Sequence, residues 1–287
     1  MRYLNFSQED IQKKLCYKLA DSYYYSELQI DALEGLYCNS INKNQQEFLK
    51  TPNQSIQSSI FQDYALIGEK SYHLTVSSTV TANYLLKTGK HEFCITPNVI
   101  QSKDSIIDDI LLLGPVLILN LALNKVFCLH ASAFLIKDKI FILMGDSGTG
   151  KSTIARFMNE QKNCQRIADD ILPLKIDENR LQVLPNFPQL KLPVSSQYKG
   201  DNLVKETILL FAQKSTDNTC LKSLDNFSCI KYLINHSVAT KLFAKSELQN
   251  HLSFCHKSST LVKSYRLKYQ HSRDSLFQLY SQLNEIV

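Results

Sequence analysis

The sequence GDSGTGKS at residues 145–152 has the residue types and the spacing of a Walker A phosphate-binding loop. Its glycines allow a tight turn in which backbone N–H groups point at phosphate oxygens. A helix beginning at the loop adds its positive N-terminal dipole, Lys151 would neutralise the β- and γ-phosphates, and the Ser152 hydroxyl would bind Mg²⁺. We therefore expect ATP and Mg²⁺ to be held by Gly145, Asp146, Ser147, Gly148, Thr149, Gly150, Lys151, Ser152 and Thr153.

The segments on both sides of the loop support this prediction. Residues 139–144 form an apolar run of strand length, and residues 153–160 have the pattern of an amphipathic helix. A strand, a glycine-rich loop and a helix in this order are what the motif requires. A glycine-rich turn without function is the alternative, and these flanks argue against it.

A pair of carboxylates, Asp169 and Asp170, follows Lys151 after 18 residues and ends a strand expected over residues 165–168. A βαβ unit brings successive strand ends to one sheet edge, so we expect the pair near the γ-phosphate. One carboxylate could hold Mg²⁺ together with Ser152, and the other could accept the proton of an attacking hydroxyl. The alternative is a solvated turn pair.

His130 lies within an apolar segment, residues 126–134, which predicts a strand beside the one that precedes the loop. A buried histidine needs a polar partner, and a structural role is the simpler interpretation. With the two carboxylates nearby, His130 could instead orient one of them or contact phosphate.

Strands and helices alternate around the loop, which predicts an α/β or α+β fold. Residues 1–104 predict a β-rich N-terminal region that binds a partner or packs on the rest, with antiparallel strands at 72–77 and 91–95. Residues 105–287 predict the nucleotide-binding domain. Its further expected elements are a helix at 105–123, strands at 125–135, 172–176, 181–184, 207–212 and 265–269, and helices at 224–238 and 272–286.

The composition limits the kinds of protein to which this chain can belong. The chain has 287 residues, 44% hydrophobic and 21% charged, which indicates a globular protein with a substantial core. Eight cysteines without a C-x-x-C pair indicate scattered thiols in a reducing compartment. The most apolar stretch, residues 106–123, is too interrupted for the ~20 apolar residues of a membrane span and predicts a buried helix. We expect a cytoplasmic protein that does not bind membranes.

Charge is unevenly distributed along the chain. Residues 231–273 contain eight basic residues against Glu247 alone, although the whole chain has a net charge of +5. An acidic or phosphate-bearing partner could bind such a stretch, but solvated helix faces are the simpler explanation. No stacking aromatic residues interleave with these charges in the pattern of a nucleic-acid surface, so we expect no nucleic-acid binding.

Three segments together resemble the catalytic core of bacterial HPr kinase/phosphorylase. They are LHASA at 129–133, GDSGTGKS at 145–152 and RIADD at 166–170, which match the family's histidine strand, loop and acidic strand end. The segments LPNFPQLKL at 184–192 and SRDS at 272–275 resemble the broader HPr-kinase-like group. That group includes proteins similar to the kinases that phosphorylate the C-terminal serine of lasso-peptide precursors.

The resemblance implies a P-loop core related to phosphoenolpyruvate carboxykinase. Lys151 would bind the phosphates and Ser152 the metal. Asp170 would be the general base with Asp169 on the metal side, or the two roles could be exchanged. His130 would support the base. An assembly of several copies is possible, since HPr kinases are hexamers.

Some features of HPr kinases are missing. Thr153 stands where they carry glutamate, and their E-x-R-G segment has no match in residues 191–200. Arg266 and Arg273 are the candidates for their catalytic arginine. The resemblance therefore implies a kinase that acts on a serine of a peptide or small protein other than HPr, peptide-natural-product precursors included.

Three alternatives remain from the sequence. The chain could be a regulatory ATPase that binds nucleotide without transferring phosphate, or a kinase for a small molecule. A third possibility is a docking protein whose loop is a relic. The intact glycine, lysine and serine positions of residues 145–152 argue against a relic.

Overall fold

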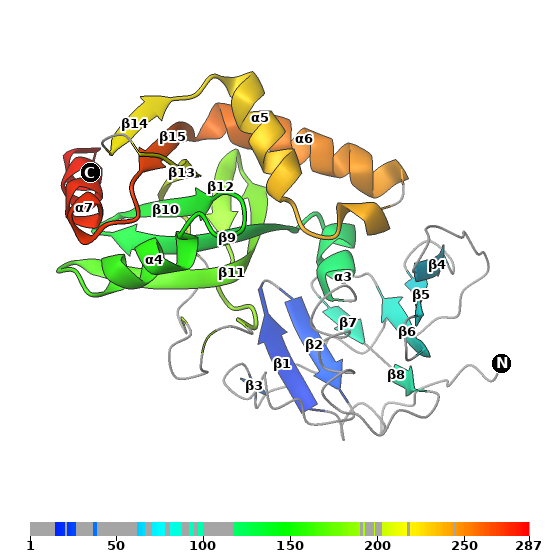
Figure 1. Cartoon of the computed structure of the whole chain (residues 1–287). Coiled ribbons are helices and arrows are strands. Elements are labelled where there is room, and N and C mark those ends of the chain that lie inside the picture. The colour runs from blue at the N-terminus through cyan, green and yellow to red at the C-terminus, as the bar shows by residue number, and fades with distance from the viewer. Residues whose placement is uncertain are drawn as a thin grey trace. The chain divides into compact units, whose positions relative to one another are not determined.

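The computed structural model describes residues 15–20, 22–26, 37–38, 62–66, 71–77, 81–87, 92–94, 97–99, 117–189, 192, 198, 203–216, 219–243 and 245–286. The chain divides into two compact units (Figure 1). Unit 1 combines Met1–Asn124 with Ala239–Lys245, and unit 2 combines Lys125–Val238 with Ser246–Val287. The predicted domain boundary between residues 104 and 105 lies outside the described residues.

Unit 1 contains two four-stranded sheets. The first has the order β3 (Tyr37–Cys38), β1 (Leu15–Leu19), β2 (Ser22–Ser26) and β7 (Glu92–Cys94), and the second has the order β4 (Gln62–Leu66), β5 (Ser71–Ser77), β6 (Thr81–Lys87) and β8 (Pro97–Val99). The prediction of an antiparallel strand at 72–77 is confirmed by β5, which is antiparallel to both its neighbours. The same prediction for 91–95 is wrong, because β7 pairs in parallel with β2. Between β2 and β7 the chain forms β4, β5 and β6 of the second sheet. A connection of this length allows two strands to pair in parallel.

Unit 2 is built on one seven-stranded mixed sheet with helices, as the mixed α/β prediction requires. Its order is β12 (Arg180–Val183), β11 (Cys164–Asp177), β9 (Phe127–Ile136), β10 (Lys139–Met144), β13 (Glu206–Lys214), β15 (Lys263–Tyr269) and β14 (Cys220–Ser223). Strands β10, β13 and β15 are parallel to one another, and the other neighbouring pairs are antiparallel.

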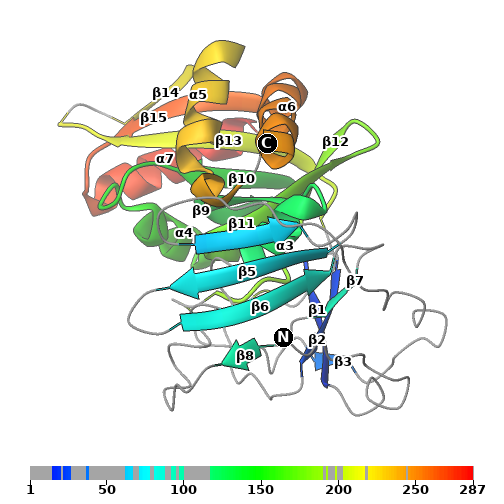
Figure 2. The ribbon, with the colours of Figure 1, turned by 90° about the vertical axis from the view of Figure 1, so that its right-hand side faces the viewer.

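Helices cover both faces of this sheet. Helices α4 (Lys151–Asn159) and α7 (Arg273–Ile286) share an apolar core with sheet residues that include Leu210. Phe211, the next residue of β13, stacks instead on Tyr232 of α5 (Asn226–His236). Because successive strand residues point to opposite faces, α5 packs on the face away from α4. Phe127 of β9 contacts Phe254 of α6 (Lys245–Leu261), and Figure 2 shows α5 and α6 next to each other.

The prediction that the Asp169–Asp170 pair ends a strand is wrong. The predicted strands 165–168 and 172–176 are one strand, β11, which runs 14 residues with the pair in its interior. It extends this far because residues 164–174 pair with β9 and residues 174–177 pair with β12. Both carboxylates therefore lie beside a neighbouring strand.

In the sheet and helices of unit 2, α6 and the short strand β14 were not predicted. Of the helix predicted over 105–123, the described part is α3 (Leu117–Leu123), and its leucines at 117, 119 and 121 are buried, as expected for a buried helix. A further short 3-10 helix spans Thr240–Leu242. No helix in the described part of the chain is long and apolar enough to cross a membrane.

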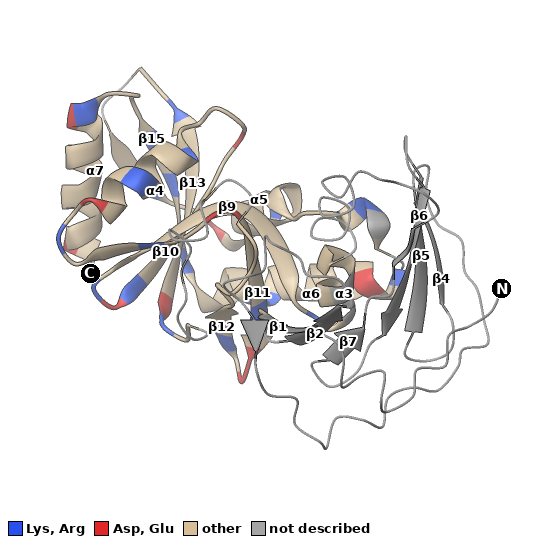
Figure 3. Ribbon diagram, turned by 90° about the horizontal axis from the view of Figure 1, so that it is seen from below, with Lys and Arg blue, Asp and Glu red and all other residues tan. Residues whose placement is uncertain are grey.

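The basic residues of 231–273 are distributed over α5, the short 3-10 helix, α6, β15 and the start of α7. Figure 3 shows Lys and Arg interspersed with Asp and Glu over the elements of unit 2. This distribution agrees with solvated element faces more than with one basic binding surface.

Candidate functional site

The glycine-rich loop joins the end of β10 at Met144 to the start of α4 at Lys151. Gly150 has a φ of 84°, and a Cβ added there would lie 1.9 Å from the Tyr269 hydroxyl oxygen. That hydroxyl donates a hydrogen bond to the carbonyl of Thr149. At Gly145, a Cβ would lie 2.6 Å from the carbonyl oxygen of Ala212. The loop is therefore packed against the ends of β13 and β15, at a distance that only glycine permits.

Tyr269 stays a hydrogen-bond donor over the physiological pH range. Burial raises the pKa of its phenol to about 12. The neutral O–H can then donate to the Thr149 carbonyl near physiological pH. This residue fixes the last turn of the loop from β15, and sequence analysis assigned it no role.

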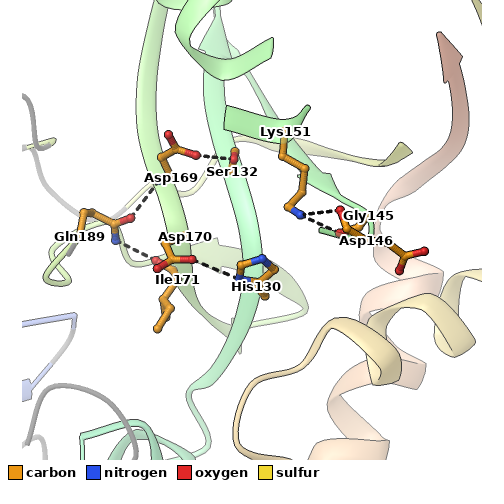
Figure 4. Close-up of polar contacts among 9 residues, drawn as sticks. All are labelled: His130, Ser132, Gly145, Asp146, Lys151, Asp169, Asp170, Ile171 and Gln189. Atoms are coloured by element: carbon orange, nitrogen blue, oxygen red, sulfur yellow. Dashed lines mark hydrogen bonds and ion pairs between the residues drawn. The ribbon is translucent and has the colours of Figure 1, made fainter. Parts of the chain in front are cut away.

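Lys151 spans the loop it follows. Its side chain is 8% exposed, and its Nζ donates to the carbonyl oxygens of Gly145 at 2.7 Å and Asp146 at 3.2 Å (Figure 4). The backbone of Asp146 also accepts a hydrogen bond from the Thr149 hydroxyl at 2.7 Å. The lysine charge is thus placed inside the curve of the loop, while Ser152 and Thr153 are exposed on the first turn of α4.

The start of α4 has the features of an anion site. Its N-cap residue is Gly150, which has no side chain to bond the first N–H groups of the helix. Those groups need an acceptor, and phosphate oxygens are suitable ones. The uncapped helix, the close-packed glycines and the Lys151 cation fit a polyphosphate.

A metal ion bound by protein side chains alone does not fit. Within the described residues, no three His, Cys, Asp or Glu side chains are grouped to hold a metal ion. Mg²⁺ usually takes one or two protein ligands and completes its coordination with phosphate oxygens and water. The exposed Ser152 hydroxyl at the start of α4 fits that pattern.

Strand register places Asp169 and Asp170 level with the loop, although both residues lie in the interior of β11. Asp170 is opposite Ala131 of β9, while Asp169 is opposite Ser132, which in turn is opposite Leu143 near the end of β10. Neighbouring strands lie about 4.8 Å apart, so two strand spacings put the pair about 10 Å from the end of β10. The sheet therefore brings the pair and the loop to one region.

Asp169 is the buried member of the pair, at 5% exposure. Its Oδ1 accepts a hydrogen bond from the Ser132 hydroxyl at 2.7 Å, and its Oδ2 lies 3.7 Å from Nη1 of Arg166. A register shift between Arg166 and Ala168 places a bulge at Ile167, which explains how residues three apart in a strand meet. Both oxygens of Asp169 have partners inside the protein.

Asp170 is the more accessible member, with a side chain 17% exposed. Its Oδ1 lies 3.2 Å from Nδ1 of His130, whose side chain is 40% exposed. His130 is on β9 and therefore lies between Asp170 on β11 and Gly145 after β10 (Figure 4). The structure thus brings His130 and Asp170 together and places this pair on the loop side of β11.

Gln189 holds the backbone on both sides of Asp170. Its Oε1 accepts a hydrogen bond from the Asp169 N–H at 2.9 Å, and its Nε2 donates to the Ile171 carbonyl at 2.8 Å (Figure 4). Nε2 also donates to the Phe187 carbonyl at 3.2 Å. The amide supplies the hydrogen bonds that an adjacent strand would supply. Sequence analysis included Gln189 in a family-like segment and gave it no role.

His236, the last residue of α5, is a second histidine near the loop. Burial lowers the pKa of its imidazole, and the charges of Lys151 and His130 lower it further, while the Asp146 carboxylate opposes them. Charges act over roughly a Debye length, about 10 Å, so the three groups and His236 belong to one region of the structure. No motif in residues 224–238 signals this position, because it depends on the way α5 returns to β9.

The two candidate catalytic arginines make other contacts. Arg266 is on β15 and its Nε has no hydrogen-bond partner among the described residues, while the Arg273 guanidinium lies 6.0 Å from the ring centroid of Phe277. Among the described residues, neither makes an ion pair with the loop or with Asp169 and Asp170. Arg166 is the arginine that contacts the pair.

Comparisons with known proteins give a distant structural similarity. No family model matches the sequence, and no curated protein matches it. The structure is similar to the HPr(Ser) kinase/phosphatase from Coxiella burnetii with a TM-score of 0.30 and 11% sequence identity, over 55% of this chain and 94% of that chain. A similarity this weak does not by itself establish the fold family or an activity. The chain has a mixed α/β fold with a seven-stranded mixed sheet.

Proposed function

We propose that the protein is an ATP- and Mg²⁺-dependent kinase that transfers the γ-phosphoryl group to a serine hydroxyl of a peptide or small protein. The observation that carries the proposal is the placement of Asp170, paired with His130, level with a glycine-rich loop that ends in an uncapped helix. A phosphate cradle and a supported carboxylate are the two parts that phosphoryl transfer to a hydroxyl requires.

The cradle divides its task between backbone and side chain. The N–H groups of the loop and of the first turn of α4 would bind the β- and γ-phosphates, with Lys151 neutralising their charge. Lys151 would exchange its bonds to the carbonyls of Gly145 and Asp146 for phosphate oxygens of higher negative charge. The Ser152 hydroxyl would bind the Mg²⁺, which would offset the negative charge of the phosphates.

Asp170 is better suited than Asp169 to act as the base. Asp169 is buried against Ser132 and Arg166, whereas the Asp170 side chain is 17% exposed and lies against His130 on the side of the loop. In the reaction the carboxylate of Asp170 accepts the serine proton, and the serine oxygen forms a bond to the γ-phosphorus. The bond from the γ-phosphorus to the bridging oxygen breaks, and ADP leaves. His130 would keep the carboxylate aimed at the hydroxyl.

The acceptor class rests on the resemblance of residues 126–175 to HPr kinases and not on the geometry. A protein or peptide acceptor, with peptide-natural-product precursors among the candidates, follows from that group. Association of several copies is a further proposal from the same source.

The test uses [γ-³²P]ATP, Mg²⁺ and an arrayed library of serine-containing peptides that includes C-terminal serine. Wild type should label a subset of the array, and Lys151→Ala and Asp170→Asn should each lower the rate by about 10²-fold or more. Asp177→Asn is the matched control, since Asp177 is an exposed carboxylate of the same strand. Labelling by Asp170→Asn at the wild-type rate would remove Asp170 as the base.

A second candidate function is a regulatory ATPase that binds nucleotide and transfers phosphate to water alone. The observation that favours it is that, among the described residues, neither Arg266 nor Arg273 makes an ion pair with Asp169 or Asp170. The same assay separates the two functions. Release of ³²P-phosphate without any labelled peptide or added metabolite would favour the ATPase, and label on a metabolite would indicate a small-molecule kinase.

A further inference from the structure

The C-terminus of α5 is fixed against β9 beside the candidate site. Leu129 of β9 forms an antiparallel bridge with Ser237, and the Val238 N–H donates to the Cys128 carbonyl at 2.9 Å. In an antiparallel pair the neighbours of bridged residues also face each other. The residue that precedes Ser237 is His236 and the one that follows Leu129 is His130. The bridge therefore sets the two histidines side by side.

The position of the His236 ring is fixed from the sheet. It lies parallel to the Tyr232 ring, with an interplanar angle of 4° and a centroid distance of 6.5 Å. Tyr232 in turn stacks on Phe211 of β13 at 4.5 Å, and its hydroxyl accepts a hydrogen bond from Gln213 at 3.2 Å. This row of rings runs from the sheet to the end of α5, so the imidazole does not depend on a flexible segment for its orientation.

Ser237 is also held from the other side. Its hydroxyl donates to the Leu233 carbonyl at 2.8 Å and lies 2.6 Å from Nε2 of His251 on α6. Cys255 lies 3.4 Å from the same nitrogen. This buried group ties α5 to α6 directly after His236. Together with the bridge to β9, it leaves His236 itself half-buried and partly accessible to a ligand.

The charges that act on His236 agree with the position that the bridge gives it. Asp146 and Lys151 from the loop and His130 from β9 all act on its imidazole. Lys151 is the residue that would neutralise the β- and γ-phosphates, and His130 supports the base that would act next to the γ-phosphate. A group that lies close to both is close to the terminal phosphate. Burial keeps the imidazole neutral near pH 7, and a neutral imidazole has one N–H to donate.

We propose that His236 is a phosphate-binding residue whose imidazole N–H donates a hydrogen bond to the terminal phosphate of the nucleotide. The inference rests on the proposed ATP-binding function. It adds an element from the opposite face of the sheet to a site otherwise built from β9, β11 and the loop. It also gives the protein a means to distinguish ATP from ADP, because the hydrogen bond exists only when the γ-phosphate is present.

The test is calorimetric titration of the full chain with Mg–ATP and with Mg–ADP. His236→Leu should weaken Mg–ATP binding about tenfold, which is the loss of one hydrogen bond to a charged group, and should leave Mg–ADP binding within about twofold. His236→Gln keeps an N–H donor and should retain most of the preference for ATP. His256→Leu, at an exposed position on α6, is the matched control and should bind both nucleotides as wild type does.

The outcomes separate this inference from the function on which it rests. If His236→Leu loses ATP and ADP affinity equally, or loses neither, the role of His236 is overturned and the proposed ATP-binding function is unaffected. Wild type that binds neither nucleotide would overturn the proposed function and this inference with it. If His236→Leu melts at a lower temperature than wild type, His236→Gln decides: a retained preference for ATP supports the hydrogen bond, and a lost preference contradicts it.

Discussion

The amide of Gln189 is the contact whose removal we expect to disturb the site most without touching a substrate group. Its side chain is 1% exposed and makes three hydrogen bonds to backbone groups, two of which flank Asp170. Leucine has a similar size and no polar atom, so Gln189→Leu removes these bonds and leaves the packing nearly unchanged.

The expected loss of stability can be worked from those bonds. The Asp169 N–H is buried and would lose its acceptor, which costs about 1–3 kcal/mol. The carbonyls of Ile171 and Phe187 would each lose one donor, and a carbonyl keeps a second lone pair, so each adds about 0.5 kcal/mol. The free energy of unfolding should therefore fall by about 2–4 kcal/mol, a large share of the roughly 5–15 kcal/mol of a typical domain.

Urea denaturation and amide hydrogen exchange measure this directly. In Gln189→Leu the Asp169 amide should exchange faster than in wild type by more than the global loss of stability accounts for. Gln165→Leu is the matched control, because Gln165 is exposed on the same strand, and it should change the unfolding free energy by less than about 0.5 kcal/mol. If the Gln189→Leu variant is as stable as wild type and its Asp169 amide is equally protected, Gln189 does not hold the backbone around Asp170 as we infer.

Two further predictions concern the loop and a buried histidine. Gly150→Ala should weaken Mg–ATP binding in a calorimetric titration far more than Gly148→Ala: both have a positive φ, but only at Gly150 would the Cβ meet the Tyr269 hydroxyl, at 1.9 Å. If the two variants weaken Mg–ATP binding equally, the contact with the Tyr269 hydroxyl is not the cause of the loss. Burial lowers the pKa of His251, so the unfolded chain binds more protons than the folded one as pH falls below about 6.5, and stability is lost in that range. His251→Gln should reduce the loss measured by urea denaturation between about pH 7 and pH 5.5, and an unchanged pH dependence would contradict this.

The sequence predicts the parts of the site that depend on local pattern. The strand at 139–144 and the helix after Gly150 appear where the motif requires them, because glycine, lysine and apolar spacing act within a few residues. The interruption predicted at Asp169 and Asp170 is wrong for a tertiary reason. Two adjacent carboxylates resemble a strand end, yet Ser132 and His130 of the neighbouring strand accommodate them inside β11.

Other features depend on contacts that the local sequence does not signal. Helix α6 was not predicted because its buried positions include Glu247, His251, Ser258 and Ser259, which weaken the apolar period. Gln189 meets the backbone of Asp169 from 20 residues away, and His236 reaches the site only because α5 returns to β9. Long-range contacts of this kind become visible only when the chain is folded.

The central claim is that the loop at residues 145–152 holds a triphosphate with the Asp170 carboxylate beside its terminal phosphate. A crystal structure of the chain with Mg²⁺ and a non-hydrolysable ATP analogue tests it most directly. We predict the β- and γ-phosphates against the first N–H groups of α4 and Lys151. We also predict the Asp170 carboxylate within one water layer, about 6 Å, of the γ-phosphorus. A nucleotide bound away from this loop, or a carboxylate well beyond that distance, would contradict the account.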